Sequence, residues 1–225
     1  TDITFYNLKK GEATLTIIEP SRYPEKISSL YYAASLSTVA VVVIDSITAS
    51  LGECILELNC AGIRKGYLIL RNYLDAGQIA PLIKGTVLEG YTTLPDDMNV
   101  LREQLLSDAE AITPVTGKEP GIVPIDHHFN VKGIGTVILG CVHGGTIHKH
   151  DQVIVHPTGK TVQIRSIQKH DDDVADAYTG DRVGLALKGI EAEELDRGYV
   201  LSAAPDIVSR CEVAGKVTII PYWPE

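Results

Sequence analysis

The feature that most constrains the fold is a change of pattern near the middle of the chain. Residues 113–121 are rich in proline, glycine and threonine, a composition typical of a linker between two folded domains. Before this segment, helical and strand patterns alternate, whereas after it only short β-branched runs occur between turn residues. The chain of 225 residues is long enough for two domains of about a hundred residues each. We therefore predict an α/β domain at 1–112, a linker at 113–121 and an all-β domain at 122–205.

Apolar runs in the first domain predict buried strands. Residues 13–18 and 39–44 are short runs of apolar and β-branched residues, as in a parallel sheet. The segment 24–34 between them begins with Pro24, which a first helical turn tolerates, and continues with apolar residues at helical spacing. Together these segments predict a β-α-β unit. The pattern also predicts a helix at 53–61, a strand at 67–70 and a closing helix at 96–111.

The second domain has the pattern of a small β-barrel. Its β-branched runs are short and regularly spaced, and glycine and aspartate separate them, which is typical of barrels. The tail at 206–225 contains an apolar run at 213–220 that we interpret as one more strand, which would begin a third β domain. The predicted barrel strands are 135–139, 152–155, 161–167, 182–187 and 199–201.

Composition and charge exclude several classes of protein. The longest purely apolar run, 39–44, is far shorter than the roughly twenty residues of a membrane-spanning helix, and no signal segment opens the chain. The net charge of −9 opposes a protein that coats duplex DNA, because that affinity comes from clustered lysine and arginine. The four cysteines form no C-x-x-C pair, which fits a reducing compartment. We expect a cytoplasmic protein that binds neither DNA nor a membrane, and a local contact with structured RNA stays open.

No motif of a common catalytic or metal site is complete. A phosphate-binding P-loop needs G-x-x-x-x-G-K-[ST], and the nearest segment, 154–161, has Ile154 in place of the first glycine. His148 and His150 would share one strand face, but no other metal ligand lies at the spacing of a structural zinc site. The three aspartates at 171–173 lack the glycine and glutamate of a calcium loop. We therefore expect no metal site formed by the protein alone.

Three blocks of the second domain resemble the second domain of the translational GTPases. They are P-I-D-H-H-F-N-V-K-G-I-G-T-V at 124–137, G-D-R-V-G-L-A-L-K-G at 180–189 and R-G-Y-V-L at 197–201. Several spaced blocks in the right order are a more specific signal than a single glycine pair. The resemblance is to elongation factor Tu and, more closely, to the selenocysteine-specific elongation factor. It covers nearly all of 122–205 and implies an elongation factor Tu domain 2-like β-barrel.

By this resemblance, the barrel would carry the pocket that receives the amino acid linked to tRNA. Arg182 stands where the selenocysteine factor also has an arginine, so a cation could face an anionic selenolate, carboxylate or phosphate. The residues themselves leave an alternative, in which Phe129 and Thr136 pack the barrel and Arg182 forms an ion pair with Asp126 or Asp181. The resemblance implies a pocket lined by Asp126, His127, Phe129, Thr136 and Arg182.

By the same resemblance, the first domain aligns with the GTP-binding domain of the family. Residues 15–18 stand where the strand before the switch II motif lies, and the family's P-loop and first switch, which come further upstream, are not in this sequence. Glu19 occupies the position of the Mg²⁺-binding aspartate, Arg22 that of the glycine that senses the γ-phosphate, and Tyr23 that of the histidine that positions water. Arginine lacks the backbone freedom of glycine, and a phenol titrates near pH 10, far above an imidazole. These departures imply a degenerate P-loop GTPase-like domain with no catalytic residue in place.

The segment N-Y-L-D at 72–75 resembles the guanine-reading N-K-x-D motif, with Tyr73 in place of the lysine. The resemblance implies that Asp75 accepts hydrogen bonds from the guanine ring, that Asn72 supports the base and that Tyr73 stacks on it. An ordinary strand-to-helix turn explains the same residues equally well. The implied cofactors are GTP or GDP, bound weakly or not at all, and Mg²⁺ only together with a nucleotide.

Three hypotheses for function follow. The first is a divergent, archaeal-type paralogue of elongation factor Tu and the selenocysteine factor that binds tRNA, the ribosome or another translation component, with guanine nucleotide binding weak or lost and GTP hydrolysis impaired. The second is a true GTP-hydrolysing elongation factor of which this chain is a truncated part. The third is a protein–protein adaptor that reuses both folds. A P-loop motif upstream of Thr1 would favour the second hypothesis, because that loop supplies most of the phosphate contacts.

Overall fold

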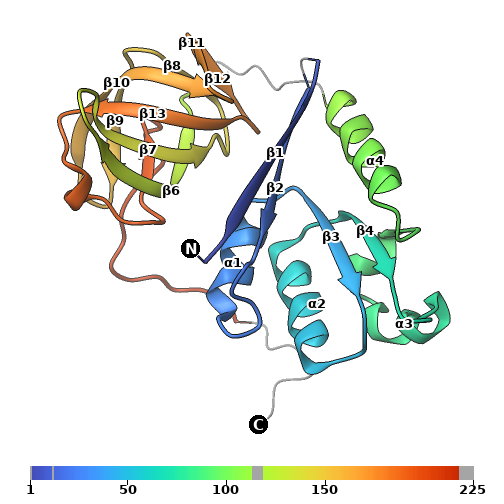
Figure 1. Cartoon of the computed structure of the whole chain (residues 1–225). Coiled ribbons are helices and arrows are strands. Elements are labelled where there is room, and N and C mark those ends of the chain that lie inside the picture. Colours follow the sequence, from blue (N-terminus) through green and yellow to red (C-terminus); the bar gives the residue numbers. More distant parts are fainter. Residues whose placement is uncertain (1, 12, 113–118, 218–225) are drawn as a thin grey trace. The chain divides into compact units, whose positions relative to one another are not determined.

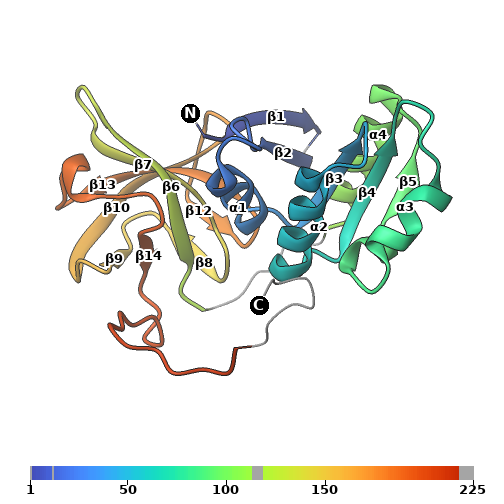
Figure 2. The ribbon, with the colours of Figure 1, turned by 90° about the horizontal axis from the view of Figure 1, so that it is seen from below.

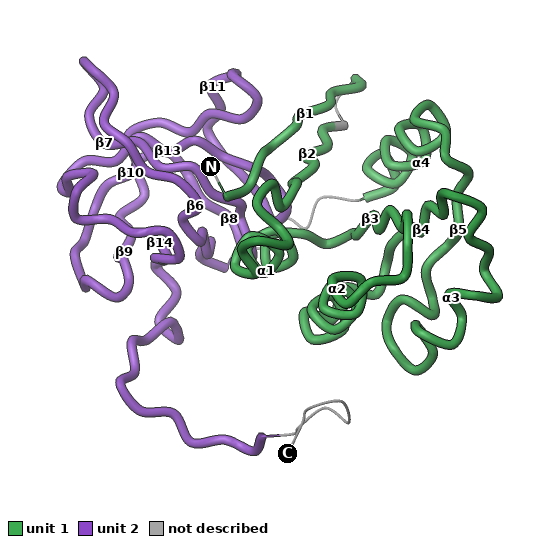
Figure 3. Tube along the Cα trace, turned by 60° about the horizontal axis from the view of Figure 1, so that its bottom comes forward, with its two compact units in different colours: residues 1–113 green, residues 114–225 purple. Residues whose placement is uncertain are grey.

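The chain divides into two compact units near residue 113. The computed structural model describes residues 2–11, 13–112 and 119–217. Its first unit comprises residues 1–113 and its second unit residues 114–225 (Figure 3). Most of the linker predicted at 113–121 lies outside the described residues.

The first unit contains a parallel sheet and a separate hairpin (Figure 1). The sheet is three-stranded with the order β3-β4-β5. The antiparallel hairpin pairs β1 with β2 along their whole length. The strands are β1 (Thr4–Lys10), β2 (Ala13–Glu19), β3 (Val39–Ile44), β4 (Lys65–Leu70) and β5 (Thr92–Leu94).

Helices cover both faces of the parallel sheet (Figure 2). Side chains alternate along β4, so Leu68 packs with the α2 residues Ile55 and Leu58, whereas Tyr67 and Ile69 pack with α4. The hairpin contacts α4 through β2. The helices in the described part of the first unit are α1 (Ile27–Ser35), α2 (Ala49–Ala61), α3 (Ala76–Ile83), the 3₁₀ turn η1 (Val87–Gly90) and α4 (Met98–Glu110), and the second unit has the 3₁₀ turn η2 (Ala192–Glu194).

The predicted strands and helices of the first unit are confirmed, but the pairing of one strand and the start of one helix differ from the prediction. Strand β2 pairs with β1 and not with β3, so the predicted β-α-β unit is wrong as a paired unit. The physical reason is that β1 directly precedes β2, and a hairpin closes a much shorter loop than a crossover does. Helix α1 begins at Ile27, and Pro24 lies in the turn before it.

The second unit is a closed β-barrel of six strands (Figure 1). Its sheet has the order β11-β10-β13-β7-β6-β14-β9, and β9 also pairs with β10, which closes the ring. The short strand β11 (Asp172–Val174) pairs antiparallel with the end of β10, and β8 (Thr146–His148) pairs with β12 (Asp176–Tyr178). The barrel strands are β6 (Ile122–Val131), β7 (Gly135–Cys141), β9 (Gln152–His156), β10 (Lys160–Lys169), β13 (Arg182–Lys188) and β14 (Val200–Ser202).

All five predicted barrel strands are confirmed, as β7, β9, β10, β13 and β14. Their inward side chains form one apolar core that includes Ile138, Ile164 and Leu185. Periodicity alone did not predict β6, because Pro124 and two histidines interrupt its apolar pattern. A barrel closed in this way leaves few unpaired strand edges.

The tail after β14 is the part of the fold that departs most from the prediction. Residues 206–217 form neither helix nor strand, so the strand predicted at 213–220 is wrong over its described part. Val213 and Val217 are largely exposed, and without a neighbouring strand their backbone has no ladder to join. Residues 218–225, the end of the suggested third domain, lie outside the described residues. Among the described residues, no helix combines the length and apolar composition that crossing a bilayer requires.

Candidate functional sites

The outer surface of the barrel carries rows of side chains from β6, β7 and β13. In the first row His127 lies opposite Leu139, which lies opposite Gly184. In a second row, Val137 lies opposite both Phe129 and Ala186. In a third row, on the other side of the first, Arg182 lies opposite Cys141. Because side chains alternate along a strand, these residues face away from the core. We name Asp126, His127, Phe129, Val137, Leu139, Cys141, Arg182 and Gly184 the outer patch.

Asp126 lies at a β-bulge, where β6 shifts register between Ile125 and His127. The side chain is only 1% exposed, and that of Arg182 is 14% exposed. The Arg182 guanidinium donates to both carboxylate oxygens, at 3.2 Å for the Nη2 to Oδ1 contact. His127 Nδ1 lies 2.6 Å from Oδ1. These partners compensate a charge that would otherwise be costly to bury.

The neighbours of Asp126 also set its protonation. Burial alone would raise the pKa of Asp126, but the hydrogen bonds from His127 and Arg182 and the charge of Arg182 hold the pKa below its usual value. The carboxylate is therefore ionised at neutral pH, and Arg182 is fixed beside it. The alternative in which Arg182 pairs with Asp126 is thus confirmed. Asp181, the other candidate partner, pairs with Lys169 at 2.9 Å.

Phe129 and Thr136 lie in opposite environments. The Phe129 side chain is 42% exposed in the outer patch, where an aromatic ring can stack on a planar group. Thr136 is buried, and its hydroxyl donates to the Ile190 carbonyl at 2.7 Å. Thr136 therefore packs the barrel, as the alternative reading expected, and does not join the outer patch.

Two residues of this region were not predicted from the sequence. Arg197 Nε donates to the Asp126 carbonyl oxygen at 3.0 Å, and Cys141 lies opposite Arg182. Arg197 is the first residue of the R-G-Y-V-L block, so that block was the signal that could have pointed to it. Cys141 had no such signal, because its place beside Arg182 depends on the pairing of β7 with β13.

The N-Y-L-D segment lies directly after β4, at the carboxyl end of the parallel sheet. Ligands commonly bind at this edge of α/β sheets. Asn72 and Tyr73 have φ angles of 53° and 63°, a left-handed conformation uncommon for residues other than glycine. The Asn72 side-chain amide donates to the Asp45 carbonyl at 3.2 Å, which ties the turn to the end of β3. The Tyr73 side chain is fully exposed.

Asp75 has a structural role at the start of α3. Its carboxylate accepts a hydrogen bond from the Gln78 backbone N–H at 3.0 Å, and the Gln78 side chain accepts from the Asp75 N–H at 3.0 Å. This reciprocal capping box satisfies two backbone donors of the helix. An ordinary strand-to-helix turn therefore accounts for the position of Asp75, and reading of guanine by Asp75 and Asn72 stays a prediction.

The three residues at the expected switch positions form contacts within the first unit or face solvent. Glu19 accepts a hydrogen bond from the Tyr6 hydroxyl at 2.7 Å. The Tyr23 hydroxyl donates to the Ser50 carbonyl at 2.5 Å and lies 3.2 Å from Glu53 Oε2. Burial, and then the hydrogen bond to Glu53, raise the pKa of Tyr23 to about 12. Arg22 is exposed.

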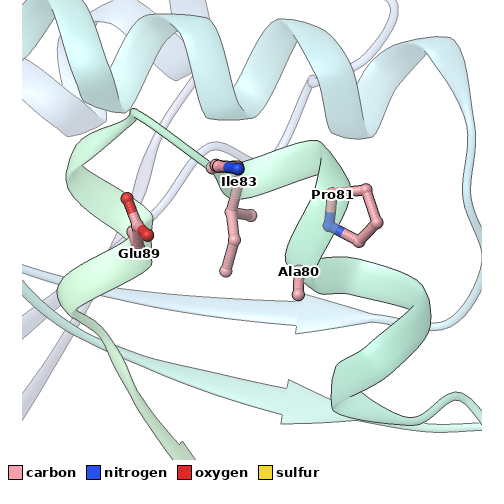
Figure 4. Close-up of a pocket in the computed structure, with 5 residues that line it drawn as sticks. Ala80, Pro81, Ile83 and Glu89 are labelled. Carbon is pink, nitrogen blue, oxygen red and sulfur yellow. The ribbon is translucent and has the colours of Figure 1, made fainter.

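A cavity of about 460 Å³ lies between α3 and η1 (Figure 4). None of the predicted site residues lines it. Within the described ranges, no group of three or more histidine, cysteine, aspartate or glutamate side chains is arranged to hold a metal ion. The cavity is lined by Ala80, Pro81, Ile83, Lys84 and Glu89.

Comparison with known proteins shows which family the barrel resembles. Residues 135–202 match the family described as elongation factor Tu domain 2. The selenocysteine-specific elongation factor of Methanocaldococcus jannaschii is 46% identical over 81 residues, which are 36% of this chain and 17% of that factor. These matches support a relationship between this chain and the translation elongation factors.

The likeness to elongation factors extends over both units. The crystal structure of translation elongation factor SelB from Methanococcus maripaludis, in complex with the GTP analogue GppNHp, matches with a TM-score of 0.74 at 25% identity. The match covers 92% of this chain and 50% of that chain, so neither unit alone accounts for it. An uncharacterized protein of Methanocaldococcus jannaschii is 42% identical over 204 residues, 90% of this chain and 65% of the relative. This elongation factor-like chain therefore spans less than two thirds of the length of these relatives.

Proposed function

We propose that the barrel binds RNA of the translation machinery, with the acceptor end of tRNA as its first ligand, and that it does so in the cytoplasm. The observation that carries this proposal is the exposed ring of Phe129 on the same outer face of the barrel as the Asp126–Arg182 ion pair. Both lie on one face of a domain that belongs with elongation factor Tu domain 2. The matched relatives include a selenocysteine-specific elongation factor.

The chemistry of the outer patch suits the end of an RNA better than its duplex backbone. An aromatic ring stacks on bases regardless of their sequence, at about 1–3 kcal/mol per base. Val137 and Leu139 continue the apolar surface beside Phe129. The net charge of −9 disfavours broad contact with phosphates, which needs clustered cations. A local contact at a single-stranded end requires only a few placed groups.

We further propose that the first unit binds guanine nucleotide weakly or not at all and does not hydrolyse GTP. The support is that Glu19 and Tyr23 already form contacts within the unit. The amide of Asn72 is engaged by a backbone carbonyl, and Asp75 caps a helix. A nucleotide would have to compete with these contacts, and Mg²⁺ would enter only with its phosphates. SelB of Methanococcus maripaludis, by contrast, binds a GTP analogue in its solved structure.

Fluorescence anisotropy with a labelled tRNA tests the barrel proposal. Loss of the Phe129 ring in Phe129→Ala removes the stacking surface, so we expect the dissociation constant to rise about 5- to 100-fold. The matched control is Ile134→Ala, because Ile134 is 46% exposed at the tip of the same β6–β7 hairpin and lies outside the outer patch. This control should bind within about twofold of the unaltered chain.

Two results would contradict the proposal. Equal loss of affinity in both variants would mean that the hairpin tip, and not the outer patch, contacts RNA. Absence of binding to aminoacylated and deacylated tRNA up to about 100 μM would remove tRNA as the ligand and favour the adaptor hypothesis.

A further inference from the structure

Residues 19–26 run from the last residue of β2 to the residue before α1 and contact the hairpin near both ends of the segment. We call this segment the brace. Glu19 accepts from the Tyr6 hydroxyl at 2.7 Å, and the hydroxyls of Ser21 and Thr4 lie 2.5 Å apart. At the other end of the segment, Lys26 Nζ forms an ion pair with Asp2 at 2.7 Å. Three points of contact therefore fix the brace to β1 and the residues before it.

The opposite side of the brace is held to α2 by Tyr23. The phenol hydroxyl donates to the Ser50 carbonyl at 2.5 Å and lies 3.2 Å from a Glu53 carboxylate oxygen. Ser50 is in the first turn of α2, whose N-terminus Thr48 caps by accepting from the Leu51 N–H. Since the pKa of Tyr23 is raised to about 12, the hydroxyl stays a donor at every pH near neutrality.

The anchor of Tyr23 is connected to the turn that carries Asn72. Ser50 follows the loop that leaves β3 at Asp45, and the Asn72 side chain donates to the Asp45 carbonyl. The hairpin has no hydrogen-bonded partner strand in the parallel sheet. Tyr23 therefore supplies a polar contact between the hairpin side of the unit and α2, the helix that follows the loop containing Asp45.

We propose that the brace is a fixed element, anchored by the Tyr23 hydroxyl, which keeps one conformation whether or not a nucleotide is present. This inference rests on the proposed weak nucleotide binding, because it assigns a static role to the segment that stands at the family's switch position. A ligand shifts a conformational equilibrium only by its differential affinity for the two states. A nucleotide that binds weakly can therefore supply little free energy to break the four contacts of the brace.

Hydrogen exchange of the nucleotide-free chain tests the anchor. We expect slow exchange of backbone amides over residues 19–26 and in the first turn of α2. Tyr23→Phe keeps the ring and removes only the hydroxyl, so exchange there should become about 2- to 10-fold faster, the range expected for one lost hydrogen bond. The matched control is Tyr31→Phe, because Tyr31 is an exposed tyrosine on α1 whose ring contact with Tyr32 remains in the variant.

Exchange is then repeated with GDP and with a non-hydrolysable GTP analogue, and calorimetry on the same samples reports whether the nucleotide binds. Unchanged exchange over 19–26 is the expected result. The proposal is overturned if either nucleotide changes exchange in the brace, or if Tyr23→Phe and Tyr31→Phe behave alike. Tight nucleotide binding with an unchanged brace would refute only the proposed weak binding and would leave the fixed brace intact.

Discussion

Asp126 carries a charge where its side chain is almost fully buried, and neighbouring groups compensate that charge. Removing one member of a buried ion pair costs more than the pair contributes, because the remaining charge loses its partner. Arg182 would be that remaining charge. The ion pair therefore links the stability of the barrel to the shape of the outer patch.

We predict that Asp126→Asn lowers the free energy of unfolding by about 3 kcal/mol. Asparagine keeps the volume and removes the charge that holds Arg182. Urea unfolding followed by circular dichroism measures the change. Asp171→Asn is the control, because Asp171 is exposed and its φ of 70° suits asparagine. A loss in Asp126→Asn no larger than in the control would contradict the assigned role of the ion pair.

The lowered pKa of Asp126 also gives a pH dependence with a definite sign. The folded-state pKa lies below the ordinary value of 3.8, so the stabilisation is fully present above that pH and is lost as the pH falls through the folded-state pKa. The difference in unfolding free energy between the unaltered chain and Asp126→Asn should therefore be present near neutral pH and should shrink below about pH 4. Urea titrations at each pH test this, and a difference that instead grows in acid would show the wrong sign.

At the element scale, close backbone approach limits which residues the barrel strands accept. A Cβ atom on Gly140 would lie 2.5 Å from the Pro124 carbonyl oxygen of β6, closer than any real contact. A Cβ on Gly184 of β13 would lie 3.5 Å from the Leu139 side chain and 4.0 Å from Gln168 Cβ, both ordinary contacts. The bulge at Asp126 follows directly after the close approach of β6 to Gly140.

We predict that Gly140→Ala destabilises the barrel by about 1–3 kcal/mol, because β6 must move to accommodate the methyl group. Gly184→Ala is the matched control and should change the stability by less than about 0.5 kcal/mol. Thermal unfolding of both variants measures the difference. Equal melting temperatures for the two variants would mean that β6 moves aside without cost and would refute the steric account.

Local patterns predicted individual elements better than they predicted contacts between them. The β-branched runs were sufficient for five barrel strands, and helical spacing was sufficient for α1, α2 and α4. The partner of β2 was missed because strand pairing depends on the rest of the fold and not on the strand's own residues. Helix α3 was missed as well, since Pro81 inside it argues against a helix.

The candidate sites show the same division between local and long-range information. Asp126 and Arg182 are 56 positions apart, and without the resemblance the sequence could not decide whether Arg182 pairs with Asp126 or with Asp181. The local alternative for Thr136, packing of the barrel, agrees with its buried hydroxyl. The engagement of Tyr23 with α2 could not be predicted, because it depends on how the turn before α1 approaches Ser50.

At the scale of the whole molecule, the two units match the fold of elongation factors but differ in how their predicted site residues are placed. In the barrel, Asp126 lies in contact with both His127 and Arg182. The first unit has other residues at the switch positions, and two of these, Glu19 and Tyr23, form internal contacts. Since a fold does not determine a function, our account assigns binding to the barrel and a supporting role to the first unit.

Calorimetric titration with GTP and GDP in the presence of Mg²⁺ tests this account most directly. Asp75→Asn is the informative variant, because asparagine preserves the N-cap of α3 while removing the carboxylate that would read guanine. Our account predicts no detectable heat, or a dissociation constant near about 1 mM, with little difference between the unaltered chain and Asp75→Asn. Micromolar binding that is lost in Asp75→Asn would contradict it and would show a working guanine site in the first unit.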